Sequence, residues 1–179
     1  MSAILTACVA RFEALEDTLN GLDAAIGDGD HGTTILKGLR AAAAAEDAPE
    51  KAFRRAAGGA SGSLFAQVIA ALLKIENGAP VGSSLREAAD RIGMLGQAKP
   101  GDKTMLDALL PAAETETLEA AVEAADAGRA ATADMQAKRG RARYVEGAGA
   151  GHVDAGATSI TELLAVWTEV QRARESGGS

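Results

Sequence analysis

Apolar residues recur at intervals of three and four along most of this chain, and this spacing constrains its fold more than any other feature. An α-helix has 3.6 residues per turn, so residues spaced in this way form one apolar stripe that packs against other helices. Valine and isoleucine do not alternate with polar residues as in a half-buried strand, and alanine is abundant. The pattern predicts an all-α protein, an antiparallel helical bundle or barrel whose glycine-rich loops gather at one end. The first stripe consists of Ile4, Leu5, Cys8, Val9, Phe12, Leu15, Leu19 and Leu22.

Glycine, proline and capping residues predict where the helices begin and end. Three glycines within the segment Gly58–Ser63 disfavour a helix and predict a loop. A further glycine, Gly128, predicts a break in a late helical segment. The expected helices cover 4–20, 30–45, 50–57, 64–75, 85–95 with a serine cap at 83 or 84, 102–110 with a kink or a new helix at Pro111, 115–139 and 157–174.

Size and charge limit the class of protein. A chain of 179 residues suits one domain, residues 1–179, with a sizeable core. Its net charge of -7 and pI near 4.9 argue against a nucleic-acid partner and against binding to an anionic membrane surface. No apolar run approaches the roughly 18 residues of a membrane span, and residues 1–20 include the charged residues Arg11, Glu13, Glu16 and Asp17, so a cytoplasmic location is expected. The lone cysteine, Cys8, lies in the apolar stripe and is expected to serve packing.

The segment that follows the first stripe concentrates carboxylates, with Asp23, Asp28 and Asp30 inside eight residues. Carboxylates this close repel one another unless a cation neutralises them, and oxygen ligands without cysteine suit Mg²⁺ better than Zn²⁺ or Cu²⁺. The segment is not an EF-hand, because the ligand spacing and the terminal Glu are wrong. A second interpretation is a simple turn in which Asp30 caps the next helix. His31 could donate to a phosphate oxygen, or be a surface or capping histidine.

Three further segments are rich in glycine and small residues and could contact a nucleotide. Gly58–Ser63 precedes a buried helix, so backbone N–H groups and the helix dipole could cradle a phosphate, with Ser61 and Ser63 as nearby hydroxyls. It is not a Walker A loop, since no Gly-Lys-Ser/Thr follows, and a tight connection is the alternative. Gly96–Met105 and Arg141–Gly156 suit a base and a ribose, or are ordinary loops.

Four short motifs occur in one order along nearly the whole chain: Asp23-x4-Asp28-Gly-Asp30-His31-Gly32, Gly58-Gly-Ala-Ser-Gly62, Pro100-Gly-Asp-Lys-Thr-Met105 and Gly151-His-x-Asp154-x-Gly156-Ala-Thr-Ser159. In this combination the sequence resembles the nucleotide-binding L subunit of dihydroxyacetone kinase, the DAK2-type domain. The resemblance implies an eight-helix antiparallel barrel that binds ADP or ATP at one end, through two magnesium ions on three aspartates.

The resemblance also implies roles for individual residues. Asp23, Asp28 and Asp30 would be the metal ligands and the catalytic residues. The family's serine pair in the glycine segment is Ala60-Ser61 here, and Ala155 replaces a frequent proline. The implied phosphate contacts are His31, Gly32, Thr33, Thr34, Ala60 and Ser61, and the implied adenosine contacts are Gly96, Met105, Arg141, Asp154, Ala155 and Gly156.

The implied activity is transfer of a phosphoryl group to dihydroxyacetone or another short ketose such as erythrulose. In this family a separate K subunit holds the ketose covalently through a histidine, so the resemblance implies that partner. A phosphocarrier M subunit rephosphorylates the bound nucleotide in some bacterial versions, whereas ATP exchanges in others, and a homodimer is also compatible. Two alternatives stay open: a magnesium-nucleotide-binding regulatory module, and an acyl-phosphate-forming kinase domain of the fatty-acid type, which typically has Thr where this chain has His31.

Overall fold

The computed structural model describes residues 2–25, 27–139 and 146–177. These residues form α-helices, short 3₁₀ helices and connections, and no strand occurs among them, which confirms the all-α prediction. The elements are α1 (Ala3–Ala24), α2 (His31–Ala44), α3 (Pro49–Ala57), α4 (Gly59–Glu76), α5 (Val81–Gly96), α6 (Leu106–Ala112), α7 (Leu118–Ala131), η1 (Thr132–Asp134), η3 (Glu146–Gly149) and α8 (Ala155–Gly177).

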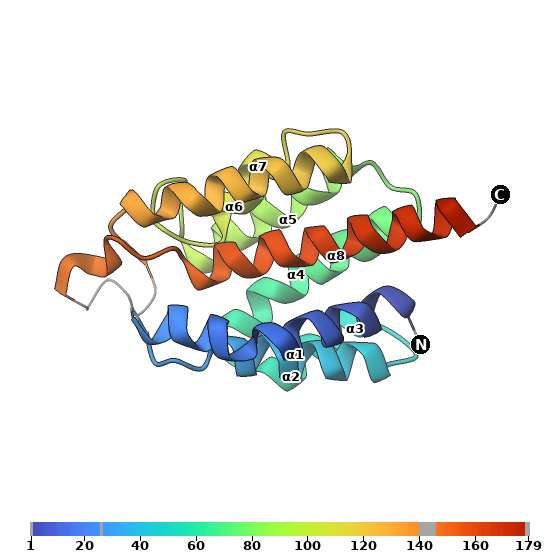
Figure 1. Ribbon diagram of the computed structural model, residues 1–179, viewed down its shortest axis with the longest axis horizontal. Helices are drawn as coiled ribbons and strands as arrows, with labels where there is room; N and C mark the ends of the chain where they lie inside the picture. The colour runs from blue at the N-terminus through green and yellow to red at the C-terminus, as the bar shows by residue number, and fades with distance from the viewer. Residues whose placement is uncertain (1, 26, 140–145, 178–179) are drawn as a thin grey trace.

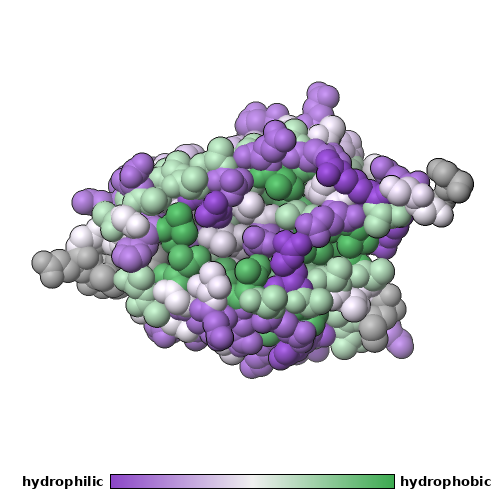
Figure 2. Space-filling model, in the orientation of Figure 1, coloured by the Kyte–Doolittle hydropathy of each residue, from purple (hydrophilic) through white to green (hydrophobic). Residues whose placement is uncertain are grey.

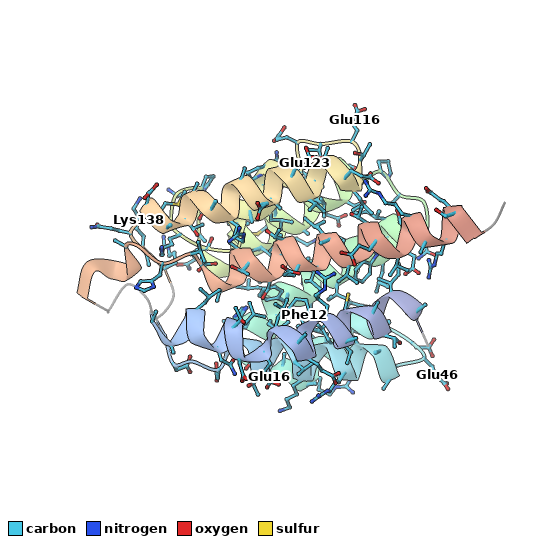
Figure 3. The ribbon with its side chains drawn as sticks, viewed as in Figure 1. Phe12, Glu16, Glu46, Glu116, Glu123 and Lys138 are labelled. Carbon is cyan, nitrogen blue, oxygen red and sulfur yellow. The ribbon has the colours of Figure 1, made fainter. Side chains whose placement is uncertain are left out.

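The helices form a closed antiparallel ring (Figure 1). Each α-helix packs against the next one in sequence, and α1 packs against α8, which closes the ring. The connections therefore alternate between its two ends. The α1–α2, α3–α4, α5–α6 and α7–α8 connections meet at one end, on the left of Figure 1, while the described termini lie at the other. Figure 3 shows the same separation, with Lys138 at the left end and Glu46 and Glu116 toward the right.

The apolar stripes of the helices meet inside the ring. Trp167, Phe12 and Phe53 are the largest fully buried side chains, and they lie among leucine, isoleucine and alanine residues. Glycine brings helices close, since a Cβ on Gly38 would lie 2.6 Å from the Phe53 ring. Cys8 lies in this core, where burial raises the pKa of its thiol to about 12. The thiol is therefore inert and serves packing.

Charged side chains join the helices on the outside of the ring. Arg11 on α1 pairs with Glu162 and Glu169 on α8, each at 2.8 Å, across the seam that closes the ring. Figure 2 shows hydrophilic residues over much of this face, with hydrophobic residues appearing mainly between neighbouring helices. None of the helices in the described ranges combines the length and the apolar character that a membrane span requires.

The glycine-rich segment Gly58–Ser63 is helical from Gly59 onward, so the prediction of a loop there is wrong. Helix α4 begins at Gly59, and the residues up to Ser63 form its first turn. Gly58 and Gly59 have φ of +70° and +57°, which glycine adopts at little cost, and this backbone turns the chain directly from α3 into α4. The predicted serine cap is also wrong, because α5 begins at Val81 with Pro80 in the N-cap position.

Two later boundaries also differ from the sequence expectation. The helix expected from residue 102 begins only at Leu106, because the Asp107 carboxylate accepts hydrogen bonds from the N–H groups of Gly101 and Thr104, at 2.5 and 2.8 Å, and folds the preceding residues into a turn. Helix α7 runs through Gly128 without the expected break. The absence of a side chain at Gly128 lets α7 pack closely against α6, since a Cβ there would lie 2.1 Å from the Asp107 carbonyl oxygen.

Candidate functional site

A cavity of about 750 Å³ opens at the end of the ring where the four connections meet. Each connection and the adjoining helix turns contribute part of its wall. The α1–α2 side provides Asp23, Gly27, Asp28, Asp30, His31 and Thr34, the α3–α4 side Ala57–Ser61, Leu64 and Phe65, the α5–α6 side Ile92, Gly96–Ala98 and Lys103–Met105, and the α7–α8 side Arg139 and Asp154–Gly156.

Three carboxylates lie together on the α1–α2 side. Asp23 belongs to the last turn of α1, and Asp28 and Asp30 follow in the connection. One oxygen from each carboxylate can be chosen so that all three lie within 4.8 Å of one another. Oδ2 of Asp23 accepts hydrogen bonds from the N–H groups of Gly29 at 2.8 Å and of Asp30 at 3.1 Å. Asp23 therefore both joins the cluster and orders the connection around it.

This donor set fits Mg²⁺, which prefers hard oxygen ligands and is bound through few carboxylates. The α1–α2 connection passes close to the Asp23 carboxylate, and this depends on glycine, because a Cβ on Gly27 would lie 2.5 Å from Oδ1 of Asp23. Asp30 occupies the N-cap position of α2, but its side chain makes no capping hydrogen bond. The Asp30 side chain therefore does not make the capping hydrogen bond of a simple capped turn, and it lies within the carboxylate cluster.

His31 joins three helices at the inner edge of this connection. Its Nε2 lies 2.9 Å from Oγ of Ser159 on α8, and its ring meets the ring of Phe65 on α4 edge to face, with centroids 5.6 Å apart. Burial lowers the pKa of the imidazole to about 4, so the ring is neutral at pH 7. His31 therefore lines the cavity as a neutral ring that is anchored by α4 and α8, and it is not the free surface histidine of the alternative interpretation.

Gly32 and Thr33 face α1, whereas the resemblance assigns them to the phosphates. The Thr33 hydroxyl donates to Glu16 at 2.7 Å and accepts from Asn20 at 3.0 Å, and its N–H donates to the Asn20 side chain at 3.1 Å. A Cβ on Gly32 would lie 2.4 Å from the Glu16 carbonyl oxygen. These two residues hold α2 against α1, whereas the next residue, Thr34, lines the cavity.

We expect Thr33→Val to lower the free energy of unfolding by about 1 kcal/mol, because its two side-chain hydrogen bonds are lost. Its affinity for Mg²⁺-ADP should stay within about twofold of the parent. Thr34→Val is the matched change on the cavity wall, and it should weaken Mg²⁺-ADP binding severalfold. Urea unfolding and isothermal titration calorimetry measure the two effects. Equal losses of affinity in both variants would contradict this division.

The first turn of α4 forms a second wall, with Gly58, Ala60 and Ser61 on the cavity. The first hydrogen bond of the helix runs from the N–H of Gly62 to the carbonyl of Gly58, at 2.8 Å, so the N–H groups between them have no acceptor in the helix. Such N–H groups, together with the helix dipole, favour an anion. Ser63 instead donates to the carbonyl four residues earlier, at 3.4 Å, so Ser61 is the hydroxyl on this wall.

The α5–α6 and α7–α8 connections form the remaining walls. Gly96, Met105 and Asp154–Gly156 line them, so the structure brings together the residues that the resemblance assigns to adenosine. The Asp154 carboxylate accepts a hydrogen bond from the N–H of Ala157 at 2.7 Å and so caps α8. Arg141, the remaining predicted contact, lies outside the described residues.

Sequence reasoning missed two cations on these walls, Lys103 and Arg139. Arg139 Nε lies 3.5 Å from Oδ2 of Asp102, which is buried in the turn before α6. Lys103 stands inside the motif Pro100–Met105, so its place in that motif was the one available signal. A lysine in a polar, glycine-containing segment otherwise suggests a solvated surface residue.

The Asp154 carboxyl should make stability depend on pH. Burial raises its pKa to about 6, above the unfolded value near 4, so the folded protein retains a proton that the unfolded chain has lost, and stability falls as the pH rises through this window. Asp154→Asn keeps an oxygen for the Ala157 N–H and removes the titration. In EDTA, the unfolding free energy of the variant relative to the parent should rise by on the order of 1 kcal/mol between pH 4 and 7. A difference independent of pH would contradict this.

A sequence profile of the DAK2 domain matches residues 25–169. The chain belongs to the DAK2 domain family. A D-erythrulose kinase from Mycolicibacterium smegmatis is 39% identical to this DAK2 domain over 179 aligned residues, which cover 81% of this chain and 30% of that kinase. The ADP-binding subunit DhaL of the PEP-dependent dihydroxyacetone kinase from Escherichia coli is 32% identical, over 89% of this chain and 90% of that subunit.

A solved structure shows the same fold. The dihydroxyacetone kinase from C. freundii in complex with AMP-PNP and Mg²⁺ superposes on this DAK2 domain with a TM-score of 0.68 and 28% identity, over 93% of this chain and 33% of that one. The chain thus spans about a third of several relatives, among them the D-erythrulose kinase and the triokinase/FMN cyclase of Homo sapiens, at 30% and 35% of their lengths. It spans nearly all of DhaL.

Proposed function

We propose that this DAK2 domain, residues 1–179 acting as one unit, is the Mg²⁺- and nucleotide-binding subunit of a kinase for dihydroxyacetone or a similar short ketose. The observation that carries the proposal is the convergence of a three-carboxylate cluster, a helix N-terminus and a wall of small and apolar residues on one cavity. Two relatives support it, since DhaL is named as an ADP-binding subunit and the C. freundii kinase was solved with AMP-PNP and Mg²⁺.

The proposal gives each wall a separate role. Asp23, Asp28 and Asp30 would hold one or two Mg²⁺ ions, which neutralise phosphate oxygens and stabilise the charge of the transferring group when bound. The N–H groups of the first turn of α4 and the Ser61 hydroxyl would hold the phosphates. The wall that includes Met105 would then face the nucleoside. The chain's contribution is to bind and orient a phosphoryl donor in a fixed position.

A separate K-type partner would hold the ketose. The D-erythrulose kinase and the dihydroxyacetone kinase of Citrobacter freundii, of which this chain spans about a third, are named as kinases, whereas DhaL, of which it spans 90%, is named as a subunit. The matched third would therefore be the nucleotide-binding part, and the partner would supply the acceptor site. DhaL belongs to a PEP-dependent kinase, so a phosphocarrier M subunit is one candidate donor for the bound nucleotide, and exchangeable ATP is the other.

A four-carbon ketose is the second candidate for the acceptor. Besides the D-erythrulose kinase, the relatives include an L-erythrulose 1-kinase from M. smegmatis at 36% identity and an L-erythrulose kinase from Pectobacterium atrosepticum at 33%. Because the partner would bind the ketose, the choice between three and four carbons would be made there.

Calorimetry and a reconstituted assay test the proposal. The purified chain should bind ADP in the presence of Mg²⁺ and lose that binding in EDTA. With a K-type partner, and with either ATP or a PEP-charged phosphocarrier, it should phosphorylate dihydroxyacetone or erythrulose. Phosphorylation of a free ketose by this chain alone would contradict the division between two proteins. Absence of Mg²⁺-dependent nucleotide binding would contradict the proposed function as a whole.

A further inference from the structure

Lys103 is a buried lysine in an unusual backbone conformation. The residue is 2% exposed, and its φ of +59° lies in the left-handed region that favours glycine. Burial also lowers the pKa of its ammonium group. A residue that carries both a strained backbone and a desolvated charge needs compensating interactions.

Those interactions come from two segments far away in the sequence. The Lys103 ammonium donates hydrogen bonds to the carbonyl of Thr132, at the end of α7, and to the carbonyl of His152, before α8. The carboxylates of Asp107 and Asp154 lie close enough to stabilise its charge. One side chain therefore ties the α5–α6 connection to both ends of the α7–α8 connection.

The segments joined by Lys103 are the walls of one half of the cavity. Residues 103–105 and 154–156 line it on adjacent sides. The Thr132 hydroxyl, next to the carbonyl that Lys103 binds, accepts a hydrogen bond from the N–H of Asp154 at 2.9 Å. A Cβ on Gly156 would lie 3.3 Å from the Cβ of Met105, so the two walls are already in close contact. The spacing between them therefore depends on how firmly they are held together.

The other half of the cavity is organised independently. The aspartate cluster is built on α1 and its connection to α2, and Asp23 orders that connection through its own hydrogen bonds. The phosphate-facing N–H groups belong to the first turn of α4. Loss of Lys103 should leave both features in place.

We propose that Lys103 is a positioning residue that sets the spacing of the nucleoside-facing walls. This inference rests on the proposed function, because it assigns that half of the cavity to the nucleoside. Lys103 acts through the walls that it joins and selects for the adenosine part of a nucleotide, while the aspartates and α4 bind the phosphates and the metal.

Calorimetry with two probes tests this, using Mg²⁺-ADP and Mg²⁺ with inorganic pyrophosphate. In Lys103→Met the Kd for Mg²⁺-ADP should rise at least about tenfold, while the Kd for Mg²⁺-pyrophosphate stays within about twofold. Lys99→Met is the matched control, since Lys99 is exposed on the same connection and should change neither value. If circular dichroism shows that Lys103→Met does not fold, Lys103→Gln, which keeps two N–H donors, takes its place. Its Kd for Mg²⁺-ADP should again rise more than its Kd for Mg²⁺-pyrophosphate, but by a smaller factor.

The outcomes separate this inference from the proposed function. An equal loss of affinity for both probes would assign Lys103 a merely structural role and overturn the inference, and so would unchanged affinity for both. In each of those cases the parent protein still binds Mg²⁺-ADP, so the proposed function stands. If the parent binds neither probe, the proposed function fails, and the inference fails with it.

Discussion

Replacing Asp28 or Asp30 by alanine is expected to lower Mg²⁺-dependent nucleotide binding, and phosphoryl transfer with a K-type partner, by at least about 100-fold. Each variant removes one of the three clustered carboxylate oxygens and leaves a cation with incomplete charge compensation. Titration calorimetry with Mg²⁺ and ADP measures the binding, and a coupled assay with the partner measures the transfer. Asp17→Ala is the control, because Asp17 is exposed on α1 outside the cluster, and it should match the parent.

The same variants distinguish a metal site from a structural turn. In EDTA, Asp30→Ala should melt at or above the temperature of the parent, because removal of one carboxylate relieves repulsion and its side chain makes no capping hydrogen bond. With Mg²⁺ the parent should gain stability and Asp30→Ala should not. Parental nucleotide binding in both alanine variants would refute the assignment of the cluster. A large loss of stability in EDTA would favour the simple turn.

Gly128→Ala is expected to be among the most destabilising single-methyl changes, at about 3 kcal/mol or more. The added Cβ would lie 2.1 Å from the carbonyl oxygen of Asp107 and 3.0 Å from its carbonyl carbon, and backbone atoms cannot turn aside as a flexible side chain can. The cost should therefore appear as separation of α7 from α6. Guanidinium unfolding followed by circular dichroism at 222 nm measures the free energy of unfolding.

Gly21→Ala is the matched control, since it makes the same chemical change in α1 with nothing within 4 Å of the new Cβ. It should raise the free energy of unfolding by about 0.5–1 kcal/mol, because alanine is the better helix former. If the two glycine-to-alanine changes alter the free energy of unfolding in opposite directions, close packing explains the glycine at position 128. Similar effects in the two variants would contradict the close contact between α6 and α7.

The all-α architecture could be predicted because the apolar spacing repeats over most of the chain. The glycine-rich start of α4 could not, because low propensity describes a helix interior, whereas a first turn needs fewer intrahelical hydrogen bonds and tolerates glycine. The prediction of a helix break at Gly128 was wrong for a related reason. A helix that packs closely against another gains more from the absence of a side chain than it loses in propensity.

The aspartate cluster could be recognised because its three members lie within eight residues and share one chemistry. Lys103 could not be assigned in the same way, because its acceptors are carbonyls 29 and 49 residues further along, which local sequence does not reveal. Thr33 and Thr34 are neighbours of identical type, and only the docking of α2 on α1 turns one toward Glu16 and the other toward the cavity.

The even number of helices in the ring places both described chain ends on the side away from the cavity (Figure 1). A biotin or a fluorescent protein attached at either end would therefore leave the cavity mouth open to solvent. Molecules anchored to a sensor surface in this way would all present the same face to the solution. Weak or transient docking of a second protein at that face could then be followed in real time without labelling a residue near the cavity.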